Sequence, residues 1–272
     1  MKQILSETLS THVIQHVSPI RREADPLNWR QVYYRIKEFR KTNLAPVDSM
    51  GCATLGRGSE KNKRFQTLVA LMLSPQTRDE MTCAAIQRLR AYEMTLNQKE
   101  FNVHTLIDIK VEELEKLVNC VGFYRVKAKN LKKMATSVAQ SNENDIPNTL
   151  EGLLKLPGVG PKIAHLCLQS AWNKIEGIGV DVHVHRITNR LQWVKTKTPE
   201  QTKAALEAIL PMEYWADINT YLVGFGQLLC SARSPKCGKC PVADLCPSMV
   251  QEKVKVTKSK TIRRKKVTLL DF

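Results

Sequence analysis

A lysine follows a glycine turn in the stretch LPGVGPKIA, which runs from Leu156 to Ala164. Gly158 and Gly160 can adopt backbone angles that other residues resist, and they allow another backbone to approach. If Pro161 begins a helix, the free amides at its start form an anion site beside the turn. Such a hairpin would bind a DNA phosphate through its backbone without reading sequence. The alternative is a plain turn between two helices, with the glycines as caps.

Lys162 would be the second residue of the helix that follows the turn. The positive end of the helix dipole disfavours an ammonium ion at this place. A neutral lysine amine is a nucleophile and forms Schiff bases with carbonyl carbons. The residues alone therefore leave two roles open for Lys162, which are attack on a carbon and contact with a phosphate.

Four of the eight cysteines lie in one short segment with the spacing C-x6-C-x2-C-x5-C; they are Cys230, Cys237, Cys240 and Cys246. The other four are scattered among apolar residues. This contrast indicates a metal site in a reducing compartment and argues against the disulfide framework of a secreted protein. Four thiolates can hold zinc or a [4Fe–4S] cubane, but only Cys237 and Cys240 have the short spacing that is usual for zinc.

The chain of 272 residues has a formal charge of +16 and a pI of about 9.6. Such an excess favours a polyanionic partner, nucleic acid first and an anionic membrane surface second. No apolar run is long enough to span a bilayer, so we expect no membrane association. Three basic residues lie between the clustered cysteines, where they would give the loop a positive edge for phosphates; they are Arg233, Lys236 and Lys239.

The apolar periodicity predicts helices and no convincing strands, so the expected fold class is all-α. Helices are expected near residues 29–39, 64–74, 78–92, 103–109, 111–119, 124–139, from about 149, and over 161–172, 182–192, 199–209 and 212–229. Residues 44–62 contain Gly, Pro and Ser and are interpreted as a linker. Residues 1–26 are expected to form a disordered leader, because their acidic residues argue against a mitochondrial presequence.

Residues 251–272 contain eight basic and two acidic residues, a net charge of +6. We expect a basic disordered tail here. Its RRKK stretch, residues 263–266, could be a nuclear address or an electrostatic DNA contact, and the alternative is a solvated tail without a specific role.

The hairpin, the stretch GVDVHVHRITNR and the cysteine spacing together resemble the endonuclease III family of helix-hairpin-helix DNA glycosylases, over roughly residues 28–247. The resemblance implies two helical domains with a DNA-binding cleft between them. One would be a helical barrel with the hairpin, residues 57–174. The other would be an iron–sulfur cluster domain, in which the N-terminal segment 27–56 joins residues 175–250. The resemblance also implies that the four clustered cysteines hold a [4Fe–4S] cluster.

In this family the lysine directly after the hairpin is the nucleophile, and it corresponds to Lys162. The aspartate that assists it corresponds to Asp181, which could also simply cap the helix that follows. The resemblance implies a bifunctional DNA glycosylase and AP lyase of base excision repair that removes oxidised pyrimidines. The amine would displace the damaged base at C1′ of the sugar, and the Schiff base would then allow strand cutting by β-elimination.

A base must leave the helical stack to reach such a pocket, and the gap that it leaves must be filled. The resemblance implies this role for Gln76, with Phe123 as an apolar wedge on the opposite side. The alternatives are an exposed loop amide and a core aromatic. His183 would lie near the pocket or a phosphate. Pro75 and Val182 depart from the family pattern, which leaves the details of the pocket open.

Two other functions compete with this interpretation. One is an adenine-mismatch glycosylase of the same superfamily, a group that lacks the lysine and has an extra C-terminal domain. The other is a non-catalytic DNA-binding module, which would need neither Lys162 nor Asp181. We expect an enzyme that acts as a monomer on double-stranded DNA containing oxidised pyrimidines or abasic sites. The expected location is the nucleus, with the mitochondrion as an open second location.

Overall fold

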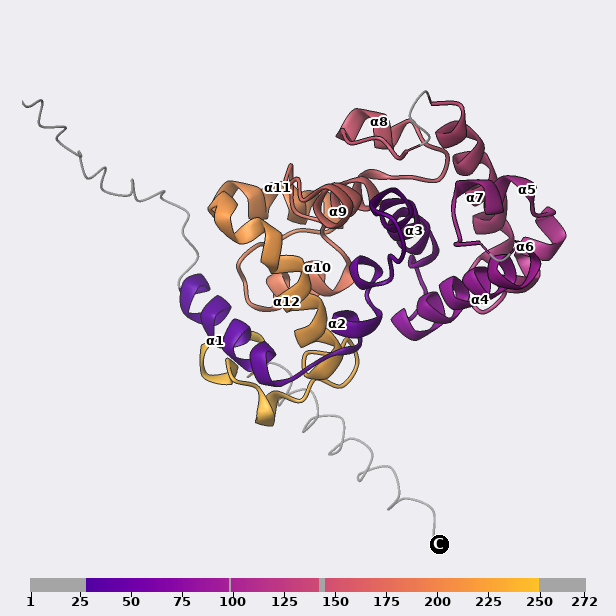
Figure 1. The fold of residues 1–272 in the computed structure, drawn as a ribbon. Helices are drawn as coiled ribbons and strands as arrows, with labels where there is room; N and C mark the ends of the chain where they lie inside the picture. The colour runs from indigo at the N-terminus through magenta and orange to yellow at the C-terminus, as the bar shows by residue number, and fades with distance from the viewer. Residues whose placement is uncertain (1–27, 98, 142–144, 250–272) are drawn as a thin grey trace, which may run out of the picture.

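A computed structural model describes residues 28–97, 99–141 and 145–249, and every regular element in these ranges is a helix (Figure 1). The all-α prediction is therefore confirmed for the described residues. The expected leader, residues 1–26, and the expected tail, residues 251–272, lie outside them. No helix within these ranges is long and apolar enough to cross a membrane.

The described chain contains twelve α-helices and four short 3₁₀-helices. Several helices begin at a hydroxyl cap, because Ser59, Thr149 and Thr198 each accept a hydrogen bond from an amide in the first turn that follows. The α-helices are α1 (Trp29–Thr42), α2 (Pro46–Met50), α3 (Glu60–Leu73), α4 (Asp79–Asn97), α5 (Val103–Asp108), α6 (Val111–Leu117), α7 (Tyr124–Ala139), α8 (Leu150–Leu154), α9 (Pro161–Trp172), α10 (Val182–Arg190), α11 (Pro199–Ile209) and α12 (Trp215–Leu228). The 3₁₀-helices are η1 (Cys52–Thr54), η2 (Met212–Tyr214), η3 (Cys237–Lys239) and η4 (Ala243–Leu245).

Helix α3 lies at the centre of the first of two hydrophobic cores. Nine consecutive residues, 65–73, are buried, as the apolar run predicted. The helix packs against α9, and also against α4 and α7 (Figure 1). This core contains residues from Leu55 to Leu168, so the central helix and the glycine hairpin belong to one packed body.

The second core joins the start of the described chain to its C-terminal part. Trp29 and Ile36 of α1 pack with residues from Ile178 to Val242, and α1 lies beside α12 (Figure 1). The domain limits inferred from the sequence remain a prediction. The two cores are compatible with them except at Leu55, which packs in the first core.

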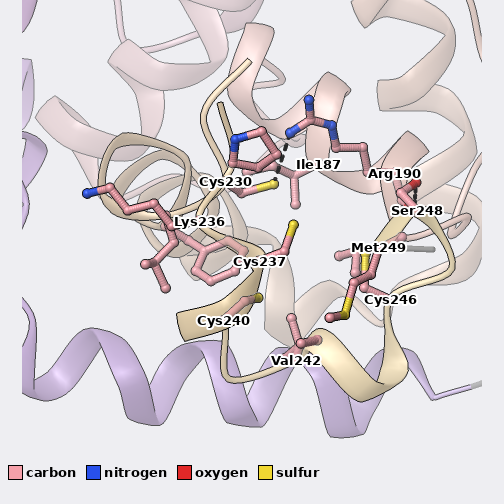
Figure 2. A pocket seen from close by; sticks show the side chains of 15 residues that line it. Ile187, Arg190, Cys230, Lys236, Cys237, Cys240, Val242, Cys246, Ser248 and Met249 are labelled. Atoms are coloured by element: carbon pink, nitrogen blue, oxygen red, sulfur yellow. Dashed lines mark hydrogen bonds between the residues drawn. The ribbon is translucent and has the colours of Figure 1, made fainter. Parts of the chain in front are cut away.

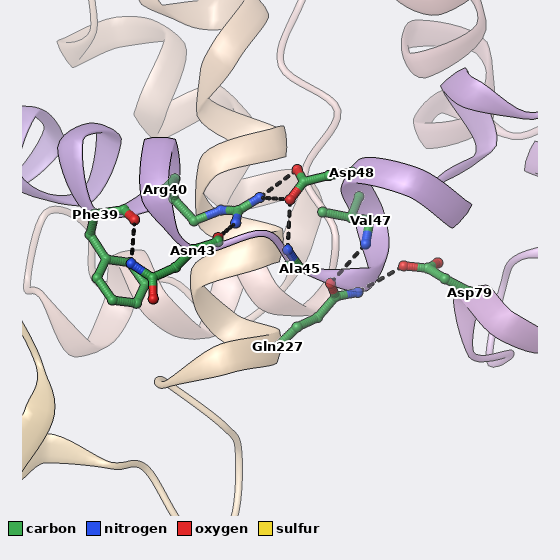
Figure 3. A network of polar contacts seen from close by, with 8 residues as sticks. All are labelled: Phe39, Arg40, Asn43, Ala45, Val47, Asp48, Asp79 and Gln227. Atoms are coloured by element: carbon green, nitrogen blue, oxygen red, sulfur yellow. Dashed lines mark hydrogen bonds and ion pairs between the residues drawn. The ribbon is translucent and has the colours of Figure 1, made fainter.

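The segment predicted as a linker, residues 44–62, is partly helical, and the prediction was wrong for α2 and η1. Pro46 occupies the first position of α2, where no N–H donor is needed. The Oδ2 atom of Asp48 accepts a hydrogen bond from the backbone amide of Ala45 at 2.7 Å. The Arg40 guanidinium donates to both carboxylate oxygens of Asp48, at 2.5 and 2.6 Å. Arg40 is only 5% exposed, so this ion pair fixes the segment from inside the molecule (Figure 3).

One amide side chain then connects α2 to both cores (Figure 3). The Oε1 atom of Gln227, on α12, accepts the amide of Val47 at 3.1 Å. Its Nε2 atom donates to the Oδ2 atom of Asp79, the first residue of α4, at 2.8 Å. The segment is thereby held as one wall of the cleft described below.

Candidate active site and metal centre

The glycine hairpin consists of α8, a turn and α9. Gly158 has φ of +83°, in the left-handed region that favours glycine. Gly160, the N-cap of α9, has φ of −98°, which any residue can adopt, so the conformational argument made for it from the sequence was wrong. A Cβ atom at Gly160 would meet no other atom within 4 Å. The surface before the α9 amides is therefore open to an approaching group.

Lys162 and Asp181 line the same cleft, which has a volume of about 280 Å³. Lys162 is exposed in the first turn of α9, and Asp181 directly precedes α10. The cleft lies between the two cores, since its other walls come from α2, η1, α3, α4 and α12. An amine and a carboxylate from the starts of two successive helices thus line one solvent-accessible space.

Asp181 is also the N-cap of α10, and this accounts for its fixed position. Its Oδ1 atom accepts the amides of His183 and Val184, both at 2.8 Å. Both amides donate to Oδ1, so Oδ2 makes neither capping bond and is available to a group in the cleft. The capping role weighed as an alternative is present, and it fixes the carboxylate at the wall of the cleft that Lys162 also lines.

Two further carboxylates line the cleft, Asp48, which is paired with Arg40, and Asp79, and the sequence analysis missed both. The second of these, Asp79, is paired with no cation among the described residues. Burial raises the pKa of this carboxyl, the hydrogen bond from Gln227 opposes the rise, and the charges of Glu80 and Asp181 add to it. The available signal was an acidic residue at the start of α4. This pattern is common at helix N-termini because of the dipole, and it does not by itself indicate a site.

Gln76 and Phe123 both lie on the surface in left-handed backbone, with φ of +53° and +57°. The Phe123 side chain is 66% exposed, so the alternative of a core aromatic is wrong. Left-handed angles are uncommon for residues other than glycine, and they occur often at functional sites.

The His183 ring faces the interior of the protein. Its Nδ1 atom lies 3.1 Å from an Arg186 guanidinium nitrogen, and a Cβ atom at Gly226 would meet the same Nδ1 at 2.4 Å. Burial lowers the pKa of His183, with the charge of Asp181 opposing the shift. The ring therefore packs between α10 and α12, close to the charges of Asp181, Asp79 and Lys162. Its place near the pocket or a phosphate stays a prediction.

The four clustered cysteines line one small cavity together with apolar residues of the second core (Figure 2). Burial raises the pKa of Cys240 to about 11, and the neighbouring cysteines push it in the same direction. Thiolates at these half-buried positions therefore need a cationic group such as iron among them. Among the described residues, no set of three or more His, Cys, Asp or Glu side chains is arranged around a single metal ion. A cubane instead takes one thiolate at each of four irons, and the donor set fits it.

Helix α10 extends from the cleft to this cysteine cavity. Asp181 caps its first turn, and Arg190 at its last turn donates to the Sγ atom of Cys230 at 3.4 Å and to the Ser231 carbonyl at 2.7 Å. Arg186 donates to the Cys230 carbonyl at 2.8 Å. The side chains of the predicted phosphate-binding residues of this loop, Arg233, Lys236 and Lys239, are exposed.

Comparisons with known proteins agree on one family. Residues 69–212 match the model of the HhH-GPD superfamily base excision DNA repair protein, and residues 230–246 match the iron-sulfur binding domain of endonuclease III. The chain is 47% identical over 251 residues to an endonuclease III homolog of Schizosaccharomyces pombe, covering 89% of this chain and 69% of that protein. It is 45% identical over 228 residues to endonuclease III-like protein 1 of Gallus gallus, covering 82% and 79%.

A solved structure of similar fold is a trapped endonuclease III–DNA covalent intermediate. The match has a TM-score of 0.68 and 28% sequence identity, and it covers 82% of this chain and 98% of that one. A non-covalent endonuclease III–DNA complex matches with a TM-score of 0.69 and the same identity.

Proposed function

Since the chain belongs to the endonuclease III family of the HhH-GPD superfamily, and is a DNA glycosylase with a [4Fe–4S] cluster, we propose that it is bifunctional. It removes oxidised pyrimidines from duplex DNA and then cuts the strand as an AP lyase. The observation that carries this proposal is the presence of Lys162 and Asp181 in one cleft. A relative of similar fold has been trapped as a covalent intermediate with DNA, which supports a nucleophile in the same cleft.

The chemistry follows from these two side chains. Asp181 takes a proton from the Lys162 ammonium group, and the neutral Nζ forms a bond to C1′ of the sugar. The bond from C1′ to the base breaks, and the base leaves with its electron pair and takes up a proton. The nitrogen gives up a proton, and its lone pair then forms the C=N bond as the C1′–O4′ bond breaks and O4′ takes up a proton. The sugar ring is thereby opened and held as a Schiff base, which acidifies the hydrogen on C2′. Loss of that proton expels the 3′ phosphate and cuts the strand.

The cysteine cavity has a separate role in this proposal. When bound, the cluster supplies four metal–thiolate bonds that hold the C-terminal loop together, and base removal requires no electron from it. The loop presents Arg233, Lys236 and Lys239 to the solvent, where they can contact DNA phosphates on either side of the lesion.

A panel of duplexes tests the proposed substrate and reaction. We expect base release and strand cutting on a duplex with thymine glycol, and strand cutting alone on an abasic duplex. We expect roughly 100-fold slower release of adenine opposite 8-oxoguanine, since a pocket built for one base rejects others by several kcal/mol at most. Adenine release without strand cutting would favour the mismatch glycosylase, and tight binding without any turnover would favour a binding module.

We further propose that the enzyme acts as a monomer in the nucleus. Residues 251–272 would be a nuclear localisation signal and would also contact DNA. The net charge of +6 in this segment motivates the proposal. The plot of log affinity against log salt has a negative slope. Deleting the segment should make this slope shallower, by about 0.9 for each DNA phosphate that the segment neutralises. Single-turnover chemistry on saturated DNA should stay unchanged. An unchanged slope would leave only the role of an address.

A further inference from the structure

The turns that present Gln76 and Phe123 are far apart in the sequence but touch in the structure. The amide of Gly122 donates to the Oγ1 atom of Thr77 at 3.1 Å. A Cβ atom at Gly122 would lie 2.8 Å from the Gln76 carbonyl oxygen, so the two backbones are in direct contact. The two exposed side chains with left-handed backbone therefore stand on adjoining turns.

Lys127, on the first turn of α7, contacts both turns at once. Its backbone amide donates to the Phe123 carbonyl at 3.1 Å. Its Nζ atom donates to the carbonyls of Leu73 and Pro75, both at 2.7 Å, and to the Oγ1 atom of Thr77 at 3.0 Å. Three acceptors use all three ammonium hydrogens, which leaves none for a phosphate.

The hydroxyl of Thr77 completes the arrangement. It accepts from Lys127 and Gly122 and donates to the Pro75 carbonyl at 3.2 Å, so its one donor and two acceptor sites are all used. Burial lowers the pKa of Lys127 to about 8, so the ammonium form that makes these bonds still predominates at neutral pH.

We propose that Lys127 is a positioning residue that locks the Gln76 turn and the Phe123 turn into one rigid wedge for entry into the DNA stack. The inference rests on the proposed function, because it takes these two side chains as the groups that fill the gap left by the extruded base. Left-handed backbone at two non-glycine residues is strained, and the strain persists only where neighbouring contacts hold it. Lys127 supplies such contacts, since hydrogen bonds from a charged donor to carbonyls are stronger than neutral ones.

Helix α7 itself supplies a matched control. Lys132 donates in the same way to the carbonyls of Leu106, Ile107 and Ile109, at the end of α5. It is therefore a second lysine with three backbone acceptors on the same helix, but it does not contact either turn of the wedge. Lys132→Met removes a comparable clamp without touching the Gln76 and Phe123 turns.

The experiment places the fluorescent base 2-aminopurine opposite an oxidised pyrimidine and measures its fluorescence at saturating protein. The parent is Lys162→Gln, in which the chemistry is blocked. We expect Lys127→Met in this parent to reduce the fluorescence rise by about tenfold. This is the effect expected from losing the hydrogen bonds that the Lys127 ammonium group donates. Lys132→Met should leave the rise unchanged. Thr77→Val serves as a second variant that removes the shared acceptor, and it should act like Lys127→Met.

The outcomes separate this inference from the proposed function. If the parent opens the base pair and both Lys127→Met and Thr77→Val open it equally well, Lys127 is only a structural lysine. An equal loss in the Lys132→Met variant, with matching falls in Tm, would lead to the same conclusion. If the parent itself produces no fluorescence rise on lesion DNA that it binds, the proposed function fails and the wedge fails with it.

Discussion

Lys162→Gln is expected to abolish covalent capture of the protein on DNA. If Lys162 attacks C1′, the intermediate is an imine, and borohydride reduces imines to stable amines. The wild type should therefore be trapped on a duplex with an oxidised pyrimidine or an abasic site. The variant keeps a polar side chain of similar length but has no nucleophile, so trapping and strand cutting should fall by about 1,000-fold or more.

The hairpin offers a matched control for this experiment. Lys155 is exposed in the same hairpin and is ion-paired with Glu151 at 2.6 Å. Lys155→Gln removes the same charge at a place outside the cleft, so trapping should persist. Lys162→Gln should still bind DNA, because the amides before α9 remain. If it instead bound weakly but turned over bound DNA at the normal rate, Lys162 would be a phosphate contact.

Asp181→Asn separates the two roles of its carboxylate. Asparagine accepts the amides of His183 and Val184 as well as aspartate does, so α10 should keep its cap and its Tm. The charge that we propose as the acceptor of the lysine proton is absent, and single-turnover base release should slow by about 100-fold. A normal rate in Asp181→Asn combined with a lower Tm in Asp181→Ala would reduce Asp181 to a cap.

Local signals in the sequence were sufficient for the helices that begin at a strong start signal. Helices α9 and α11 have the predicted limits, and Pro161 and Pro199 stand at their first positions. Helix α7 also has the predicted limits, although no side chain caps its start, and its apolar periodicity was the signal. The end of α4 was predicted too early, because residues after Tyr92 are mostly polar. Glu93 is nevertheless buried, and its carboxylate accepts a hydrogen bond from Asn97, four residues later on the same helix.

The remaining features depend on contacts between distant residues and therefore have no local signal. Helix α2 owes its order to the buried Arg40 and to Gln227, which is 180 residues beyond Val47. The Pro, Ser and Gly residues of the surrounding segment, 44–62, indicate a loop when read alone. The same reason applies to Lys127, which looks like one basic residue among several on α7. Only the folded chain places it against the carbonyls that end α3.

Composition and motif could single out Lys162, the Asp181 cap and the four cysteines, because each has a local signature. The role of Lys162 as the nucleophile came from the family resemblance and stays a prediction. Composition and motif could not tell which basic residues face DNA. Lys127 and Lys132 are committed to backbone carbonyls, whereas Arg233, Lys236 and Lys239 are exposed. A high net charge thus predicts the class of partner but does not distinguish the lysines that contact it from those that hold the fold.

Cys237→Ala should cost the protein both its cluster and much of its stability. The cysteine cavity is walled by Ile187, Phe225, Leu229 and Val242, all of which belong to the second core. Without the cluster, this cavity would leave the core open to water, and metal binding is coupled to folding in such sites. We expect a low yield of soluble protein without visible absorbance, compared with about four irons and four sulfides per chain in anaerobically purified wild type.

Cys83→Ala provides the control, because Cys83 is a half-buried cysteine of α4 outside the cavity. It should retain iron, colour and yield, which excludes a general effect of removing a thiol. Any remaining folded Cys237→Ala should bind lesion DNA less tightly, since the loop with Arg233 and Lys239 would have no anchor. A stoichiometric zinc ion with no iron in the anaerobic wild type would overturn the assignment of the cluster. A Cys237→Ala protein with normal yield and Tm would show that the cavity folds without its metal.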